Sequence, residues 1–256
     1  MTHPWFAGAP SPRVLAHRGF VPPGAEGVVE NSLAAFAAAH AIGARYVESD
    51  CHLTADGVVV LFHDDDLSRV ADDPRRVSEV THAELARIMV DRGGLVSAAE
   101  ALDAFPTLRF NLDVKAAAAA QPLGRLIARH ADRVLVTSFS DARRRVALDA
   151  ARAAGGQPAT SAGRETLLRV IGAVGSGSTA LVRRAVAGVD ALQVPERSGA
   201  LRIVTPRLLR AMHRHGVEVH VWTVNDPDAM ARLLNAGVDG LVTDRADLAL
   251  TAARER

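Results

Sequence analysis

Cysteine is nearly absent from this chain of 256 residues, and Cys51 is its single example. One thiol excludes an internal disulfide framework and a zinc site built from several cysteines, and it fits a reducing compartment. Side chains alternate along a strand, and the strand expected here turns Cys51 towards packed helices. We therefore expect a buried, inert thiol rather than a nucleophile.

An excess of charge of one sign is also lacking. Thirty basic residues balance 29 acidic ones, for a net charge of +1, and the basic positions are scattered. The basic patch of a nucleic-acid binder is therefore absent, and we expect no nucleic-acid partner.

Long apolar runs are missing as well. No stretch is both long enough and free enough of charge to span a membrane. The first residues, Met1 to Arg13, contain three prolines and no continuous apolar core, which predicts a loose lead-in rather than a secretion signal. The expectation is a cytoplasmic protein without a transmembrane segment.

Apolar residues make up 48% of the chain, enough for a full core, and they fall in short runs that alternate with helical patterns. The expected strands are Val14 to His17, Tyr46 to Cys51, Leu108 to Val114, Arg133 to Ser138, Gln157 to Ser161, Ala191 to Val194, Glu218 to Val224 and Gly240 to Thr243. The expected helices are Ser32 to Ala41, Ala98 to Ala104, Pro122 to His130, Asp141 to Ala154, Thr166 to Gly172, Thr179 to Ala187, Pro206 to His215 and Pro227 to Ala236.

This alternation, with short connections, predicts an α/β fold with parallel strands joined by right-handed crossovers. Eight strands are the number that a closed (β/α)₈ TIM barrel needs, and we expect a single domain over residues 1–256. Residues 65–95 are too many for a simple loop. They predict a small lid-like insertion after the second strand, with a helix from Thr81 to Val90.

The most informative pattern lies between Arg45 and Asp64. Glu48 and Asp50 end the second strand on one face, which suggests a cation. Asp56-Gly57 between apolar runs predicts a tight hairpin turn, and if no bulge intervenes, folding the chain about that pair places His63 opposite Asp50.

Polar residues also end other strands, where the active site of a parallel barrel lies. They are His17 and Arg18 on the first strand, Asp113 and Lys115 on the third, and Trp222 on the seventh. Three carboxylates that converge without a cation would repel one another. We therefore expect Glu48, Asp50 and Asp113 to bind one hard divalent cation, Mg²⁺ or Ca²⁺.

The remaining strand-end residues suggest acid-base chemistry on a phosphate. Histidine is the side chain whose unperturbed pKa lies near neutrality, so His17 and His63 could serve as base and acid. Arg18 and Lys115 supply positive charge that suits phosphate oxygens. Each residue also has a structural interpretation: a strand-end carboxylate can be an ion-pair partner, a histidine a packing residue, and Trp222 part of the core.

The same residues carry a resemblance to a known family. The matching segments are His17 to Gly19, Glu30 to Phe36, Gly43 to Ala44, Tyr46 to His52, Asp56-Gly57, Phe62 to Asp64, Asn111 to Lys115, Ser138-Phe139, Val221 to Asn225 and Gly237 to Asp244. Together they resemble the glycerophosphodiester phosphodiesterases over nearly the whole chain.

The resemblance implies a metal-dependent barrel enzyme that hydrolyses glycerophosphodiesters to glycerol 3-phosphate and an alcohol. It implies the cation ligands, the histidine pair and the phosphate contacts given above, and it adds Glu30, Asn31, Phe139 and Trp222 as residues lining the site. Related phospholipases use a neighbouring substrate hydroxyl as the nucleophile, and the glycerol 2-hydroxyl is the corresponding group here.

Four positions depart from the family pattern: Asp113 stands where glutamate is usual, Ser49 replaces an aliphatic residue, Val29 a proline and Ser140 an aspartate. Two other functions stay open. Lys115 would be the nucleophile of a Schiff-base, aldolase-like enzyme, and a binding protein with a decayed site is the alternative outside enzymes.

Overall fold

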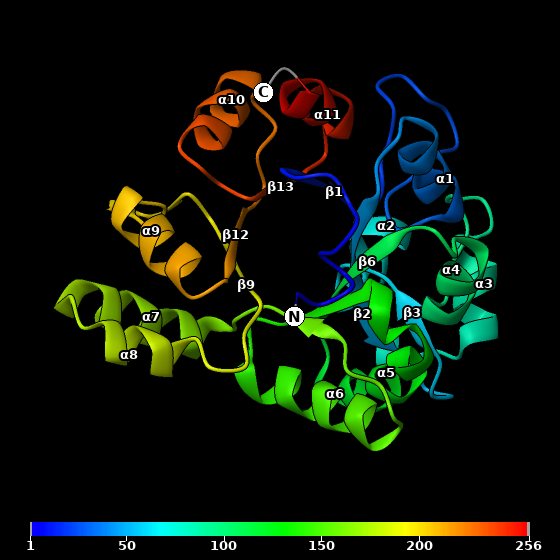
Figure 1. The fold of residues 1–256 in the computed structure, drawn as a ribbon. Coiled ribbons are helices and arrows are strands. Elements are labelled where there is room, and N and C mark those ends of the chain that lie inside the picture. Colours follow the sequence, from blue (N-terminus) through cyan, green and yellow to red (C-terminus); the bar gives the residue numbers. More distant parts are fainter. Residues whose placement is uncertain (1, 255–256) are drawn as a thin grey trace.

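A computed structural model describes residues 2–254 of the chain, and it has the predicted (β/α)₈ barrel with its helices arranged around the strands (Figure 1). The barrel strands are β1 (Arg13–His17), β2 (Tyr46–Leu53), β6 (Arg109–Val114), β7 (Val134–Thr137), β8 (Ala159–Thr160), β9 (Ala191–Val194), β12 (Glu218–Val221) and β13 (Gly240–Thr243). They pair in parallel in the order β8-β7-β6-β2-β1-β13-β12-β9. A single parallel bridge between Ser161 and Ala191 closes the ring.

The helices of the outer ring are α1 (Leu33–Ala41), α4 (Ala98–Ala104), α5 (Ala120–Ile127), α6 (Asp141–Ala153), α7 (Arg164–Ser176), α8 (Thr179–Ala185), α9 (Pro206–Arg214), α10 (Pro227–Asn235) and α11 (Ala246–Arg254). All eight predicted helices are present. The structure extends α7 at both ends and adds α11, which the sequence prediction lacked. Short 3₁₀ helices cover Val77–Glu79, Ala117–Ala119 and Ala128–Arg133. None of the helices in residues 2–254 has the length and apolar character needed to cross a membrane.

Side chains alternate between the two faces of each barrel strand, and each face contributes to a different apolar cluster. On β6, Phe110, Leu112 and Val114 belong to the large core between strands and helices. A second cluster inside the barrel includes Leu15 and Tyr46. The polar residues at the carboxyl ends of the strands lie next to this inner cluster along the barrel axis and pack against it.

The segment before β1 differs from the predicted loose lead-in. Trp5 is fully buried, its indole Nε1 donates a hydrogen bond to the carbonyl oxygen of Phe110 (3.0 Å), and its ring packs on that of Tyr46 (4.6 Å). The Arg13 guanidinium stacks near the rings of Phe6 and Tyr46. This segment therefore closes the amino-terminal end of the barrel with aromatic side chains, and it crosses the middle of the ring in Figure 1.

The hairpin after β2 has a longer turn than predicted, and its register is shifted by one residue. Leu53 pairs with Val59, the first residue of β3 (Val59–Leu61), so five residues form the turn rather than two. Thr54 Oγ1 donates to Asp56 Oδ1 (2.6 Å), and Gly57 takes the left-handed conformation (φ +83°). The register therefore places Phe62, not His63, opposite Asp50.

The predicted insertion follows β3 and contains β4 (Asp66–Leu67), α2 (Ser68–Ala71), β5 (Asp73–Arg76) and α3 (His82–Met89). Helix α3 confirms the helix predicted over Thr81 to Val90. The insertion has its own apolar cluster, which includes Phe62, Leu67 and Leu85. In contrast to the expected lid, no residue from 65 to 95 lines the cavity described below.

Candidate active site

A cavity of about 600 Å³ opens at the carboxyl ends of the barrel strands. Nine of the eleven residues predicted for the site line it: His17, Arg18, Glu48, Asp50, His63, Asp113, Lys115, Phe139 and Trp222. The two others, Glu30 and Asn31, do not line the cavity. Asn31 is buried and accepts a hydrogen bond from Ser49 Oγ (2.6 Å), which gives the departure at Ser49 a structural role.

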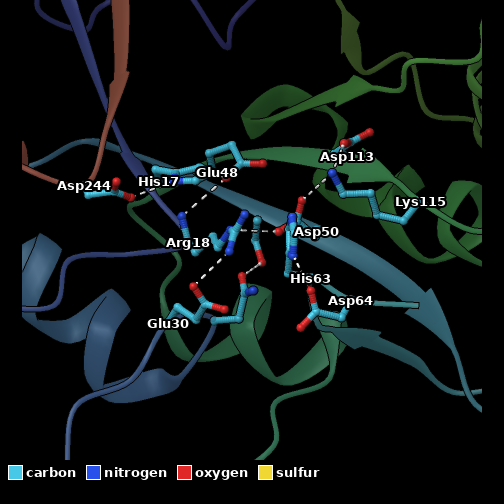
Figure 2. A network of polar contacts seen from close by, with 12 residues as sticks. His17, Arg18, Glu30, Glu48, Asp50, His63, Asp64, Asp113, Lys115 and Asp244 are labelled. Atoms are coloured by element: carbon cyan, nitrogen blue, oxygen red, sulfur yellow. Dashed lines mark hydrogen bonds and ion pairs between the residues drawn. The ribbon is translucent and has the colours of Figure 1, made fainter. Parts of the chain in front are cut away.

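Lys115 lies between two of the three clustered carboxylates (Figure 2). Its ammonium Nζ is 2.9 Å from Asp50 Oδ1 and 2.8 Å from Asp113 Oδ2. The residues Glu48, Asp50 and Asp113 are 7%, 2% and 6% exposed, so solvent hardly screens their carboxylates. Lys115 was expected to contact a phosphate, and here it is held by carboxylates.

Burial dominates the protonation of this cluster. It raises the pKa of Glu48 well above its usual range, and the charges of Asp50 and Asp113 raise it further. Burial also raises the pKa of Asp113, although Lys115 acts in the opposite direction. If all three carboxylates were ionised, they would carry one more charge than Lys115 and Arg18 balance, and the raised pKa values reflect that cost.

The donor set fits a hard divalent cation. Only carboxylate oxygens are offered, and Asp50 Oδ2 and Asp113 Oδ1 are buried without a hydrogen-bond partner. Within residues 2–254, however, no three acidic, histidine or cysteine side chains come together as a preformed metal site.

Arg18 is held by strained backbone and by three acidic residues. Its φ of +56° is in the left-handed region, and its amide nitrogen donates to Glu48 Oε2 (3.3 Å). Its guanidinium donates to Glu30 Oε2 (2.9 Å), and Nε lies 3.3 Å from Asp50 Oδ2.

The next residue, Gly19, must be glycine. Its φ is +87°, and a Cβ at this position would lie 2.7 Å from the Cβ of Ala35.

Each histidine of the predicted pair has a carboxylate on its Nδ1. His17 Nδ1 lies 2.7 Å from Asp244 Oδ1, and His63 Nδ1 lies 2.7 Å from Asp64 Oδ1 (Figure 2). An ionised carboxylate only accepts hydrogen bonds, so Nδ1 carries the proton in both rings. Nε2 is then the nitrogen left for proton transfer in the cavity.

Both carboxylates are themselves held in place. Asn225 Nδ2 donates to Asp244 Oδ2 (2.6 Å), and the hydrogen bond from His17, with that from Asn225, lowers the pKa of Asp244. For Asp64 burial acts to raise the pKa, but hydrogen bonds from His63 and Arg69 outweigh it and lower the value. Both carboxylates therefore stay ionised near neutral pH.

Glu30 connects the two sides of this network. Its two oxygens accept from Arg18 Nη1 (2.9 Å) and from Arg69 Nη2 (2.5 Å), and Arg69 also donates to Asp64. Glu30 thus orients Arg18 and, through Arg69, the partner of His63, although it does not line the cavity.

Sequence reasoning missed Asp244 as a functional residue. Its signal is its position: it directly follows β13, at the same edge of the barrel as the other strand-end polar residues. Asn225 lies beyond β12 at the same edge, and its Oδ1 accepts from the amide nitrogen of Asp244 (2.9 Å).

The sequence profile of the glycerophosphoryl diester phosphodiesterase family matches residues 17–248 of this chain. The chain is 39% identical over 238 residues to the "Probable glycerophosphodiester phosphodiesterase 2" of Mycobacterium tuberculosis, covering 91% of this chain and 88% of that protein. It is 27% identical over 261 residues to a glycerophosphodiester phosphodiesterase of Caldanaerobacter subterraneus, covering 94% and 98%. The crystal structure of the Thermotoga maritima glycerophosphodiester phosphodiesterase superposes with a TM-score of 0.69 at 26% identity, covering 93% of this chain and 96% of that one.

Proposed function

Because the chain belongs to the glycerophosphoryl diester phosphodiesterase family, we propose that it hydrolyses glycerophosphodiesters to glycerol 3-phosphate and an alcohol. The observation that carries the proposal is the pair of histidines, each oriented by a carboxylate, on a cavity that also holds Arg18 and Lys115. Two such groups suit a reaction that removes one proton and delivers another.

The histidines divide the proton transfers in this proposal. One imidazole, neutral with a free Nε2, accepts the proton of the attacking hydroxyl, which is the glycerol 2-hydroxyl or water. The other, protonated, donates its proton to the oxygen of the departing alcohol as the bond to phosphorus breaks. Asp244 and Asp64 fix the orientation of the two rings and stabilise their charged forms.

The cationic side chains bind the phosphodiester. Arg18 presents a guanidinium already oriented by Glu30, so it loses little conformational freedom when it binds a phosphate oxygen. Lys115 adds a second positive charge near the same wall of the cavity. Both groups stabilise negative charge that grows on the phosphate oxygens.

Glu48, Asp50 and Asp113 are the residues that would hold a divalent cation, Mg²⁺ or Ca²⁺. Their burial, and the two buried oxygens that accept no hydrogen bond, support this assignment. When bound, such a cation supplies charge neutralisation for the phosphodiester.

The environment of Lys115 disfavours the Schiff-base alternative. Burial lowers the pKa of this ammonium, but Asp113 and Asp50 outweigh it and raise the value. An amine nucleophile needs the neutral form, which these carboxylates oppose. Lys115 is also the only lysine of the chain, so borohydride trapping with a carbonyl substrate would report on it directly.

The test is release of glycerol 3-phosphate from glycerophosphocholine by the purified protein, with Mg²⁺, Ca²⁺ or a chelator. His17→Ala and His63→Ala should each abolish turnover while the fold survives. His40→Ala, an exposed residue of α1 outside the cavity, is the matched control and should keep full activity.

Two results would contradict the proposal. Near-normal hydrolysis by either cavity variant would remove the acid-base roles, and no release by the wild-type protein under any metal condition would favour the binding-protein alternative.

A further inference from the structure

Positive charge is concentrated in one segment of the chain. Residues 166–217 contain eight arginines and two acidic residues, although the whole chain has a net charge of only +1. Both acidic residues already have partners: Glu196 forms ion pairs with Arg202 and Arg232, and Asp190 accepts a hydrogen bond from a backbone amide (2.8 Å). The segment therefore carries positive charge that its own carboxylates do not balance.

Three of these arginines lie along one face of α9. Arg207, Arg210 and Arg214 are three and four positions apart, a spacing that makes side chains neighbours on a helix. All three are exposed, and the buried residues of the helix are Leu208, Leu209 and Met212. Like charges at this spacing repel one another and destabilise the helix.

No carboxylate relieves this repulsion. The first turn of α9 contains no acidic residue, and the helix dipole disfavours the cation of Arg207 there. Among residues 2–254, the one hydrogen bond from the three guanidinium groups is that of Arg207 Nη2 to the carbonyl oxygen of Gly175 (3.1 Å), and none of the three forms an ion pair. A bound anion would remove this cost.

The three arginines line a cavity of about 140 Å³ that is separate from the active site. Helix α7 packs against both α8 and α9, and Figure 1 shows the three helices together on the outside of the barrel. The other lining residues come from these helices and their ends: Val174, Gly177, Thr179, Val182, Ala211 and His215. Sites for larger small molecules occupy roughly 300–1,000 Å³, so this cavity suits one small anion.

The lining groups suit a phosphate. The planar guanidinium fork of arginine donates two parallel hydrogen bonds to phosphate oxygens. A phosphate monoester carries nearly two negative charges at neutral pH, more than a diester, and therefore gains more from three clustered cations. Of the described residues, no phenylalanine, tyrosine or tryptophan lines the cavity, so it lacks the stacking surface of a single-stranded nucleic-acid site.

From this arrangement we propose that the cavity between α7, α8 and α9 is a second anion site, which binds a phosphate monoester group through Arg207, Arg210 and Arg214. The site does not depend on the proposed hydrolysis. Its ligand is a free phosphate, such as inorganic phosphate or glycerol 3-phosphate, or the phosphate head group of phosphatidic acid in a membrane. Both sources present the same dianionic oxygens.

The double variant Arg210→Gln/Arg214→Gln, called the cavity variant, removes two of the three charges. Arg183→Gln/Arg184→Gln is the matched control, because it removes two exposed charges from α8 outside the cavity. The first measurement is calorimetric binding of inorganic phosphate at constant ionic strength. The cavity variant should bind one phosphate fewer than wild type, or bind it at least about tenfold more weakly, because charge-assisted hydrogen bonds are lost. The control should match wild type, and phosphate bound at the active site is common to all three proteins.

Thermal unfolding of the same proteins separates a binding role from a structural one. Without phosphate, the cavity variant should have a Tm equal to or above that of wild type, because neighbouring arginines no longer repel. Phosphate should then raise the Tm of wild type and control more than that of the cavity variant. A structural role for the arginines would instead lower the Tm of the variant without phosphate.

Cosedimentation with vesicles distinguishes the two sources of phosphate. The vesicles are four-to-one mixtures of phosphatidylcholine with phosphatidic acid, a monoester, or with phosphatidylglycerol, a diester. Preference for phosphatidic acid, lost in the cavity variant and kept in the control, supports the site with a lipid ligand. Phosphate binding without that preference supports it with a free ligand.

Three results would overturn the site. The first is equal loss of phosphate or vesicle binding in the cavity variant and the control, which would indicate diffuse surface charge. The second is no binding of phosphate or vesicles by the wild-type protein. The third is tighter binding of a single-stranded DNA oligonucleotide than of phosphate, weakened equally in both variants, which would indicate a nucleic-acid surface.

Discussion

The substitution Asp244→Asn tests whether His17 depends on its carboxylate partner. Asp244 accepts from His17 Nδ1 (2.7 Å) on one oxygen and from Asn225 Nδ2 (2.6 Å) on the other. An amide at this position has one donating end. If the amide NH2 group faces Asn225, two donors oppose each other. If it faces His17, it needs an acceptor there, so the ring proton moves from Nδ1 to Nε2. In the second arrangement Nε2 can no longer accept a proton in the cavity.

The expected magnitude follows from the loss of one charge-assisted hydrogen bond, which is worth about 1.5–3 kcal/mol. This range corresponds to roughly 10- to 160-fold in kcat/KM. The Asp244 side chain is 53% exposed, so water replaces part of the interaction. We therefore expect a decrease of about 10- to 30-fold, carried by kcat.

The assay is steady-state hydrolysis of glycerophosphocholine, with thermal unfolding measured on the same samples. Asp149→Asn, at an exposed α6 residue (70%), makes the same chemical change far from the cavity and should retain wild-type kinetics. Activity of Asp244→Asn within twofold of wild type, or a change in KM alone, would refute the orienting role.

Three further predictions concern stability, measured by urea unfolding without added metal. Lys115→Met should cost about 3–5 kcal/mol, because it removes the ammonium that two buried carboxylates share. Arg129→Met, at an exposed pair, should cost less than about 1 kcal/mol, and equal effects would show that the buried pairing is not favourable. Burial acts to raise the pKa of Glu218, but the hydrogen bonds from Arg13 and His220 lower it from 4.5 to about 2, so Glu218→Gln should lose about 3 kcal/mol at pH 7. That contribution is present above pH 4.5 and disappears as the pH falls through 2, so a loss independent of pH would contradict it. Trp5→Ala should cost about 3–5 kcal/mol, and a loss below 1 would mean that the segment before β1 does not stabilise the barrel.

The barrel was predictable because its signals are local. Apolar runs bounded by caps and glycines recur along the chain: Thr205 accepts from the amide of Leu208, and Gly216 takes φ +69° just before β12. The residues before β1 lack such periodicity. The burial of Trp5 depends on contacts with Tyr46 and Phe110, far along the chain, so no local pattern reveals it.

The sequence predicted which strand ends carry the residues of the candidate site, but not how those residues pair. Alternation placed Glu48, Asp50 and Asp113 on inward faces, and all three line the cavity. The pairing of Lys115 with two of them depends on the register of β2 against β6, which the sequence does not state. Asp244 was missed because its partner, His17, lies 227 positions away in the chain.

The ring of strands is not equally strong around its circumference. β2 and β6 share six residue pairs, whereas β9 is bridged only to Ser161, directly after β8. Local opening requires the least free energy where the fewest backbone hydrogen bonds must break. We therefore expect local opening of the barrel to be concentrated where β8 meets β9, while the longer pairing of β2 with β6 keeps Glu48, Asp50 and Asp113 in place.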